Sequence, residues 1–100
     1  MARKQTFLDV EWSDDWRESY ARLPADRRAS CDRAAMELIK GQYSPGLRVK
    51  PILPDKYFLE ARIAAGERII FRVRGERIVF VDVVAHDEIG RYGRGPRTTG

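Results

Sequence analysis

Arginines recur at alternate positions in the second half of the chain, where the pattern predicts a hairpin of two strands. Residues 57–64 and 67–73 alternate between apolar and polar side chains, and Ala65-Gly66 between them predicts a tight turn. Side chains of a strand point to opposite faces of a sheet in turn. One face of the hairpin is therefore expected to carry Phe58, Glu60, Arg62, Arg68, Ile70, Arg72 and Arg74.

Four guanidinium groups on one face suit an anionic partner, because guanidinium binds phosphate oxygens through two parallel hydrogen bonds. A ring such as Phe58 among them could stack on an unpaired base. The alternative is a solvated face with cross-strand Arg–Glu pairs, each worth less than about 1 kcal/mol.

Groups that could transfer a proton are few. His86 is the only histidine and falls at the end of the last predicted strand, where it is either an acid–base group or a polar surface residue. Tyr92 is either an acid, a stacking ring or an apolar anchor for the C-terminus. Cys31 is the only cysteine, lies among alanines in a predicted helix, and is expected to be a small core residue. We expect no metal and no cofactor.

The first 41 residues contain the elements that must support this hairpin. Residues 6–12 alternate and predict a strand, and Ser13 is a predicted helix N-cap followed by two acidic residues. Trp16, Tyr20 and Leu23 form one apolar stripe, and Pro24 ends that first helix. A second helix is predicted over residues 25–40 and ends at Gly41. Its expected buried face consists of Cys31, Ala34, Ala35, Leu38 and Ile39.

The remaining segments complete an α+β fold. Residues 47–53 are partly extended, with Pro51 indicating a sheet edge, and residues 76–84 are apolar on both faces, which is typical of an interior strand. We expect an N-terminal strand and a two-helix hairpin packed on one face of an antiparallel sheet, in the order β-α-α-β-β-β. The helices should cover the face that carries Leu59, Ala61, Ile63, Ile69, Phe71 and Val73, and leave the arginine face open.

Length and charge set the class of protein. A chain of 100 residues is one domain, predicted here over residues 1–92, with a disordered basic tail over residues 93–100. No signal peptide is apparent, and the longest apolar run, residues 78–85, is interrupted by Asp82, so a cytoplasmic protein without membrane contact is expected. The net charge of +4 arises entirely in residues 41–100, which favours an anionic partner.

Four stretches in this order resemble the RelE/ParE toxin superfamily between Phe7 and Tyr92. Leu23-Pro24-Ala25-Asp26-Arg27 resembles the junction of the family's two helices, and residues 46–52 (Gly-Leu-Arg-Val-Lys-Pro-Ile) resemble the segment before its hairpin. Residues 57–62 with 67–73 resemble the hairpin itself. Residues 83–89 (Val-Val-Ala-His-Asp-Glu-Ile) resemble the terminal signature.

The resemblance implies the toxin of a type II toxin–antitoxin system, held inactive by a cognate antitoxin. RelE-like members cleave mRNA in the ribosomal A site, and ParE-like members inhibit DNA gyrase. We expect a ribosome-dependent, metal-independent mRNA endoribonuclease that inhibits translation, with a ParE-like gyrase inhibitor without catalysis as the alternative. A member that only binds its antitoxin is a third possibility.

In RelE-like cleavage the 2′-hydroxyl attacks the adjacent phosphate, which requires a base, cations for the phosphorane charge and an acid for the leaving oxygen. The resemblance implies Arg68, His86 and Tyr92 as catalytic residues, with Glu60 as a possible base. The expected RNA-binding residues are Lys50, Lys56, Arg62, Arg72, Arg74 and Arg91. Phe58 and Glu60 occupy positions where RelE has lysines. The other interpretation of Arg68 is an ion pair with Glu60 or Glu67.

Overall fold

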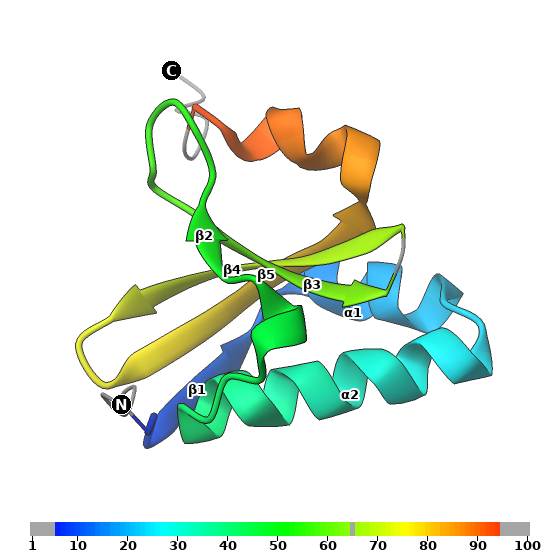
Figure 1. Ribbon diagram of the computed structural model, residues 1–100, viewed down its shortest axis with the longest axis horizontal. Coiled ribbons are helices and arrows are strands. Elements are labelled where there is room, and N and C mark those ends of the chain that lie inside the picture. Colours follow the sequence, from blue (N-terminus) through cyan, green and yellow to red (C-terminus); the bar gives the residue numbers. More distant parts are fainter. Residues whose placement is uncertain (1–5, 65, 95–100) are drawn as a thin grey trace.

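The computed structural model describes residues 6–64 and 66–94, in which two helices, two short 3-10 helices and five strands follow one another (Figure 1). In chain order these elements are β1 (Asp9–Trp12), α1 (Asp14–Arg22), α2 (Ala25–Lys40), the 3-10 helix η1 (Pro45–Leu47), β2 (Lys50–Pro51), β3 (Leu59–Ala64), β4 (Glu67–Arg74), β5 (Arg77–Ala85) and the 3-10 helix η2 (His86–Tyr92). The predicted α+β class and element order are confirmed.

The strands form one sheet in the order β1-β5-β4-β3-β2. The pairs β2–β3, β3–β4 and β4–β5 are antiparallel, as their short connections require, whereas β1 pairs with β5 in parallel. The predicted antiparallel sheet is present in β2–β5, and β1 extends it with a parallel pair that the sequence did not indicate. No hairpin joins β1 to β5, and the chain between them includes both helices, so a parallel pair is possible there.

Local signals set the ends of both helices as predicted. The Ser13 hydroxyl oxygen accepts a hydrogen bond from the Trp16 amide at 3.0 Å, which caps α1. α2 spans the predicted residues, and Gly41 ends it with a left-handed φ of 69°. That backbone conformation favours glycine, which has no Cβ to clash.

The main core lies between the helices and one face of the sheet. Phe71, Ile69 and Ala61 point from β3 and β4 into this core, where they join Leu38 and Cys31 of α2. On the β1 side, the Trp12 ring stacks on Phe80 with centroids 4.5 Å apart. Val73, predicted to lie on this buried face, is 38% exposed because it lies near the end of β4 that leads into the turn before β5.

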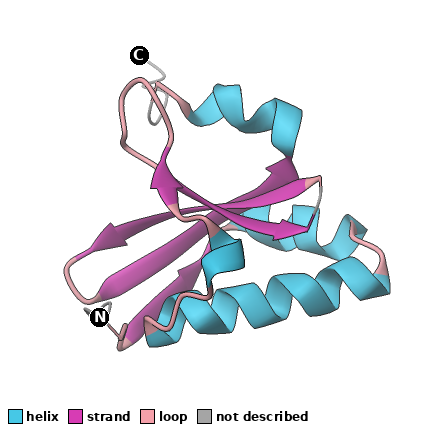
Figure 2. Cartoon of the chain, viewed as in Figure 1, coloured by secondary structure: helices cyan, strands magenta, loops and turns pink. Residues whose placement is uncertain are grey.

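The opposite face of the sheet is not open, which corrects the prediction. η2 and the segment before β3 lie on that side, away from α1 and α2 (Figure 2). They enclose a second, smaller apolar cluster of Ile52, Phe58, Ile70 and Val84, with Tyr57, Val81, Ile89 and Tyr92 packed against it. Phe58 and Ile70 are apolar residues on the arginine face, and burying them favours a cover over that face.

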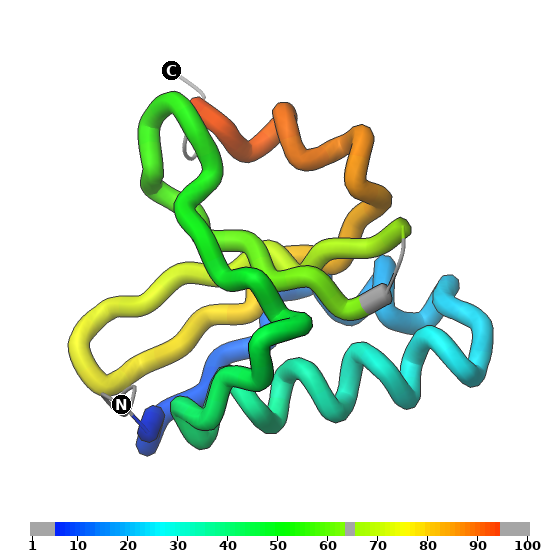
Figure 3. Tube along the Cα trace, viewed as in Figure 1, coloured from blue at the N-terminus to red at the C-terminus, as the bar shows by residue number. Residues whose placement is uncertain are grey.

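The chain after Tyr92 remains packed against the domain at Gly93, where the prediction placed the start of a disordered tail. The Gly93 carbonyl oxygen accepts a hydrogen bond from the Asp55 amide at 2.9 Å, and a Cβ at position 93 would collide with the Leu53 carbonyl oxygen. The tube in Figure 3 shows this segment beside the loop that precedes β3. Gly93 therefore belongs to the folded domain, and residues 95–100 of the predicted tail lie outside the described residues.

Candidate functional site

Strand register brings the predicted site residues together in two adjacent rows. Lys50 lies opposite Glu60, which lies opposite Ile70 of β4. In the next row Arg62 lies opposite Arg68. Three cationic residues thus come from three neighbouring strands, in the row of Glu60 or in the next row.

Arg68 and Glu60 form an ion pair within this group. Nε of Arg68 lies 3.4 Å from Oε1 of Glu60, and the two side chains are only 14% and 8% exposed. One terminal nitrogen of Arg68 donates to the Glu67 carbonyl oxygen at 3.0 Å. The predicted alternative of a pair with Glu60 is therefore present. It orients the guanidinium, whose other terminal nitrogen bonds to none of the described residues and can donate to an anion.

His86 lies at the same end of the sheet as Arg68. Arg68 is opposite Val84 and Glu67 is opposite Ala85, so His86 follows β5 directly beside the start of β4. Its backbone N–H donates to the Gly66 carbonyl oxygen at 2.8 Å, while its side chain is exposed. An exposed imidazole at the same end of the sheet as a fixed guanidinium suits proton transfer near a bound phosphate.

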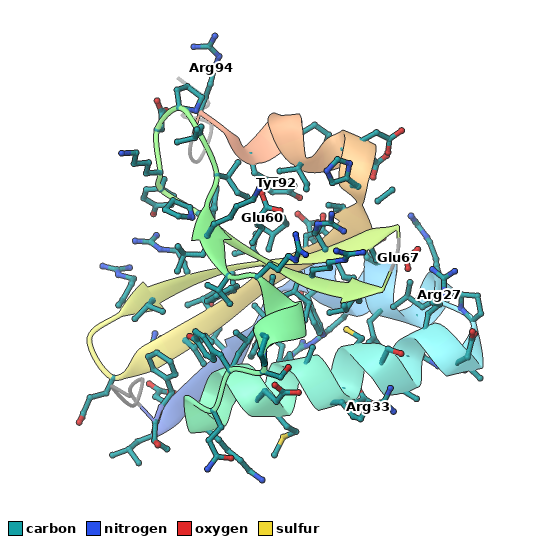
Figure 4. The ribbon with its side chains drawn as sticks, viewed as in Figure 1. Arg27, Arg33, Glu60, Glu67, Tyr92 and Arg94 are labelled. Atoms are coloured by element: carbon teal, nitrogen blue, oxygen red, sulfur yellow. The ribbon has the colours of Figure 1, made fainter. Side chains whose placement is uncertain are left out.

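Tyr92 is an anchor for η2. Its hydroxyl donates to Oδ2 of Asp82 at 2.5 Å, and its ring meets Phe58 edge-on with centroids 5.5 Å apart. Burial, followed by the hydrogen bond to Asp82, raises the pKa of the Tyr92 phenol, so it stays protonated at neutral pH. Figure 4 shows Tyr92 over the sheet face that carries Glu60.

Asp82 is a residue of this region that the sequence interpretation passed over. A bulge places it there: Phe71 pairs with Phe80 and Ile70 with Asp82, which leaves one extra residue in β5. Its carboxylate accepts hydrogen bonds from Ser19 of α1 at 2.6 Å, from the Val83 amide at 2.8 Å and from Tyr92. An aspartate inside the apolar run 78–85 was the available signal.

The other predicted RNA-binding residues are more dispersed. The Arg72 guanidinium lies over the Tyr57 ring, 4.0 Å from its centroid, and burial followed by repulsion from Arg74 lowers the pKa of Arg72. Lys56 is exposed in the loop before β3. Arg74 lies at the far end of β4, and Arg91 lies in η2, 3.8 Å from Glu88. The structure thus gathers Lys50, Arg62, Arg68 and His86, and separates Arg74 and Arg91 from them.

Three further features concern the thiol, metal binding and membrane contact. Cys31 is fully buried, and burial raises the pKa of its thiol to about 12, as expected for a core residue. Within residues 6–64 and 66–94, no group of three or more histidine, cysteine, aspartate or glutamate side chains could hold a metal ion. No helix in the same part of the chain is long and apolar enough to span a membrane.

Several solved structures that share this fold are described as toxins or toxin–antitoxin complexes. A chain of the E. coli DinJ–YafQ toxin–antitoxin complex matches with a TM-score of 0.68 and 15% identity, covering 80% of this chain and 93% of that one. The YoeB/ParE toxin from Agrobacterium tumefaciens matches with a TM-score of 0.66 and 16% identity, covering 79% and 99%. A chain of the RelBE2 complex from Mycobacterium tuberculosis matches with a TM-score of 0.65 and 19% identity, covering 85% and 98%.

These matches define the class of fold: the chain has the fold of the RelE/ParE toxin superfamily over nearly the whole length of those toxins. The resemblance inferred from the sequence motifs is confirmed at the level of the fold. No protein-family model matches the sequence, and no curated protein matches it.

Proposed function

We propose that this protein is the toxin of a type II toxin–antitoxin system and acts in the cytoplasm as a ribosome-dependent mRNA endoribonuclease. The observation that carries the proposal is the placement of Lys50, Arg62 and Arg68 in the strand rows of and next to Glu60, with Arg68 paired to Glu60 and His86 at the same end of the sheet. A metal-independent cleavage of RNA requires cations for the phosphate and a nearby proton-transfer group, and this group of residues supplies both.

We assign different tasks to the four expected catalytic residues, and their contacts support the assignment. Arg68, held by Glu60, binds the scissile phosphate and stabilises the charge that develops on it. His86 is exposed and exchanges a proton with the substrate. Glu60 is 8% exposed and already paired, so it chiefly positions Arg68 and is the second candidate base. The Tyr92 hydroxyl donates a hydrogen bond to Asp82 and positions η2.

A cognate antitoxin is the second partner in this proposal. The DinJ–YafQ and RelBE2 structures are toxin–antitoxin complexes, and their matching chains share this fold. A short antitoxin-like reading frame beside the gene would support the toxin assignment without choosing between targets.

A gyrase inhibitor without catalysis is the alternative. The observation that favours it is that Arg68 and Tyr92 are already bound to internal carboxylates. Groups held in this way suit a rigid binding surface, which needs no free acid, base or cation.

One pair of assays separates the two functions. The protein is added to a reconstituted translation reaction with primer extension on the mRNA, and to a gyrase supercoiling reaction. We expect cuts in the mRNA only with translating ribosomes and no effect on supercoiling. Inhibition of supercoiling without cleavage would support the alternative.

The site assignment is tested with His86→Gln and with the double variant Arg68→Ala/His86→Ala. Both should cleave at least about 100-fold more slowly, the usual contribution of a positioned acid–base group. Arg17→Ala is the matched control, because Arg17 is an exposed arginine of α1. His86→Gln removes an exposed side chain and should fold normally, so full activity in that variant would overturn the role of His86.

A further inference from the structure

Arg72 and Tyr57 form a stacked pair on the sheet face that carries the candidate site. The guanidinium carbon of Arg72 lies 4.0 Å from the Tyr57 ring centroid, well inside the range of a cation–π contact. Arg72 comes from β4, whereas Tyr57 lies in the segment before β3. Both side chains are half-buried, so each keeps surface in contact with solvent.

The Tyr57 ring is held in place by its neighbours. Phe58 meets it edge-on with centroids 4.7 Å apart and is itself buried in the smaller apolar cluster. Backbone hydrogen bonds close the loop on both sides: the Ile52 amide donates to the Phe58 carbonyl oxygen at 2.8 Å, and the Lys56 amide donates to that of Ile52 at 2.9 Å. The pair is therefore formed before any ligand arrives, which lowers the entropy cost of binding.

The positive charge of Arg72 is not balanced by a carboxylate among the described residues, in contrast with the charge of several other arginines. Arg27, Arg68 and Arg77 each pair with a carboxylate. Neither Arg72 nor Arg74 forms an ion pair with any of the residues that the structure describes. The exposed Lys56 precedes Tyr57 in the chain, so cations flank the stacked pair.

We propose that the Tyr57–Arg72 pair is a stacking subsite for an unpaired nucleobase of single-stranded RNA. This inference rests on the proposed function and assigns Tyr57, which the sequence interpretation did not nominate. A base stacks on the guanidinium plane, as unpaired bases do on arginine and aromatic groups. Lys56 and Arg74 attract the adjoining phosphates. The pair takes the place of Phe58, the ring expected to stack on a base, which the structure buries.

The subsite is separate from the proposed phosphate site. Arg72 follows Arg68 by four residues in β4, and at about 3.3 Å per residue the two lie roughly 13 Å apart along the strand. The stacked base consequently belongs to a different nucleotide from the one cleaved. Stacking there would contribute to the affinity and placement of the RNA and not to the chemical step.

The test uses two fluorescein-labelled hexanucleotides with an uncleavable 2′-O-methyl backbone, one with bases and one abasic, and measures their dissociation constants by anisotropy. The wild-type protein should bind the base-containing probe more tightly. Tyr57→Leu and Arg72→Lys should each weaken that binding about tenfold, the usual effect of losing one stacked base. Neither should change binding of the abasic probe.

Two control variants make the result specific. Tyr57→Phe keeps the ring and should bind as the wild type does, and Arg17→Lys changes a distant exposed arginine. Equal binding of the two probes, no binding of either, or equal losses in Tyr57→Phe and Tyr57→Leu would overturn the subsite. Ring-dependent binding of the base-containing probe in a protein that cuts no mRNA would instead overturn the nuclease and leave the subsite standing.

Discussion

The Tyr92 hydroxyl donates a hydrogen bond of 2.5 Å to the Asp82 carboxylate and thereby joins η2 to β5. Asp82 also accepts from Ser19 of α1, so one buried carboxylate connects a helix, a strand and the C-terminal segment. Because η2 begins at His86, this bond also fixes the segment that carries the proposed proton-transfer group.

Removal of that hydroxyl should destabilise the protein. Tyr92→Phe keeps the ring against Phe58 but takes one donor from the buried Asp82, and a hydrogen bond to a charged group is worth about 1.5–3 kcal/mol. Urea denaturation should show a loss of that size. Tyr43→Phe is the control, because the Tyr43 hydroxyl has no hydrogen-bond partner among the described residues. Equal losses in the two variants would contradict the anchor.

The Arg68–Glu60 pair should show strong coupling in a double-mutant cycle. Arg68→Met leaves the Glu60 carboxylate almost buried without its cation, at a cost of about 3 kcal/mol in the free energy of unfolding. Glu60→Leu in the Arg68→Met background should recover most of that loss, since no buried charge then remains. The exposed pair Arg22–Glu18 serves as the control cycle and should couple by less than about 1 kcal/mol. Additive losses at Arg68 and Glu60 would show that the pair contributes nothing to the free energy of unfolding.

Position 93 should tolerate no side chain. Gly93→Ala directs a methyl group at the Leu53 carbonyl oxygen and should cost about 1–3 kcal/mol, because the backbone must move apart. Gly90→Ala, three residues earlier, is the matched control, since its methyl group meets no atom within 4 Å. Amide hydrogen exchange at Asp55, whose N–H bonds to the Gly93 carbonyl oxygen, should accelerate only in Gly93→Ala. Unchanged protection there would show that Gly93 does not hold the loop.

The protein should lose stability at alkaline pH. Burial raises the pKa of the Cys31 thiol to about 12, above its value in the unfolded chain of about 8.5. The folded state therefore favours the protonated thiol, and its contribution is complete below pH 8.5 and declines as the pH rises toward 12. Denaturation midpoints measured between pH 8 and 11 should fall. The stability of Cys31→Ala should fall less steeply with pH, and its slope should differ from that of the wild type by roughly 1.4 kcal/mol per pH unit at most. Identical slopes in the two proteins would contradict this account.

Much of the fold followed from local patterns. Ser13 with two acidic residues after it predicted the start of α1, and Gly41 predicted the end of α2, because capping involves only neighbouring backbone groups. The alternation in residues 57–64 and 67–73 predicted β3, β4 and their faces. The parallel pairing of β1 was missed because it depends on how distant segments meet.

The sequence predicted which residues lie in the candidate site, but not which contacts they make. Parity placed Glu60, Arg62 and Arg68 on one face, and the register of the strands confirmed it. No local pattern could show that Arg68 pairs with Glu60 and that Tyr92 is bound to Asp82, since these contacts depend on strand register, a bulge in β5 and the position of η2.

The sequence by itself determined which residues share a face, because side chains in a strand alternate with a period of two. Only the tertiary structure decided how much of that face is covered and which contacts its side chains make. Phe58 and Ile70 are apolar, and their burial favours the packing of η2 and the loop before β3 over part of the sheet. The same face holds Arg68 paired with Glu60, and Arg72 stacked on Tyr57. The sequence therefore predicted the row of arginines. Long-range packing decided which of them pairs with a carboxylate, which one stacks on a ring and which form no ion pair among the described residues.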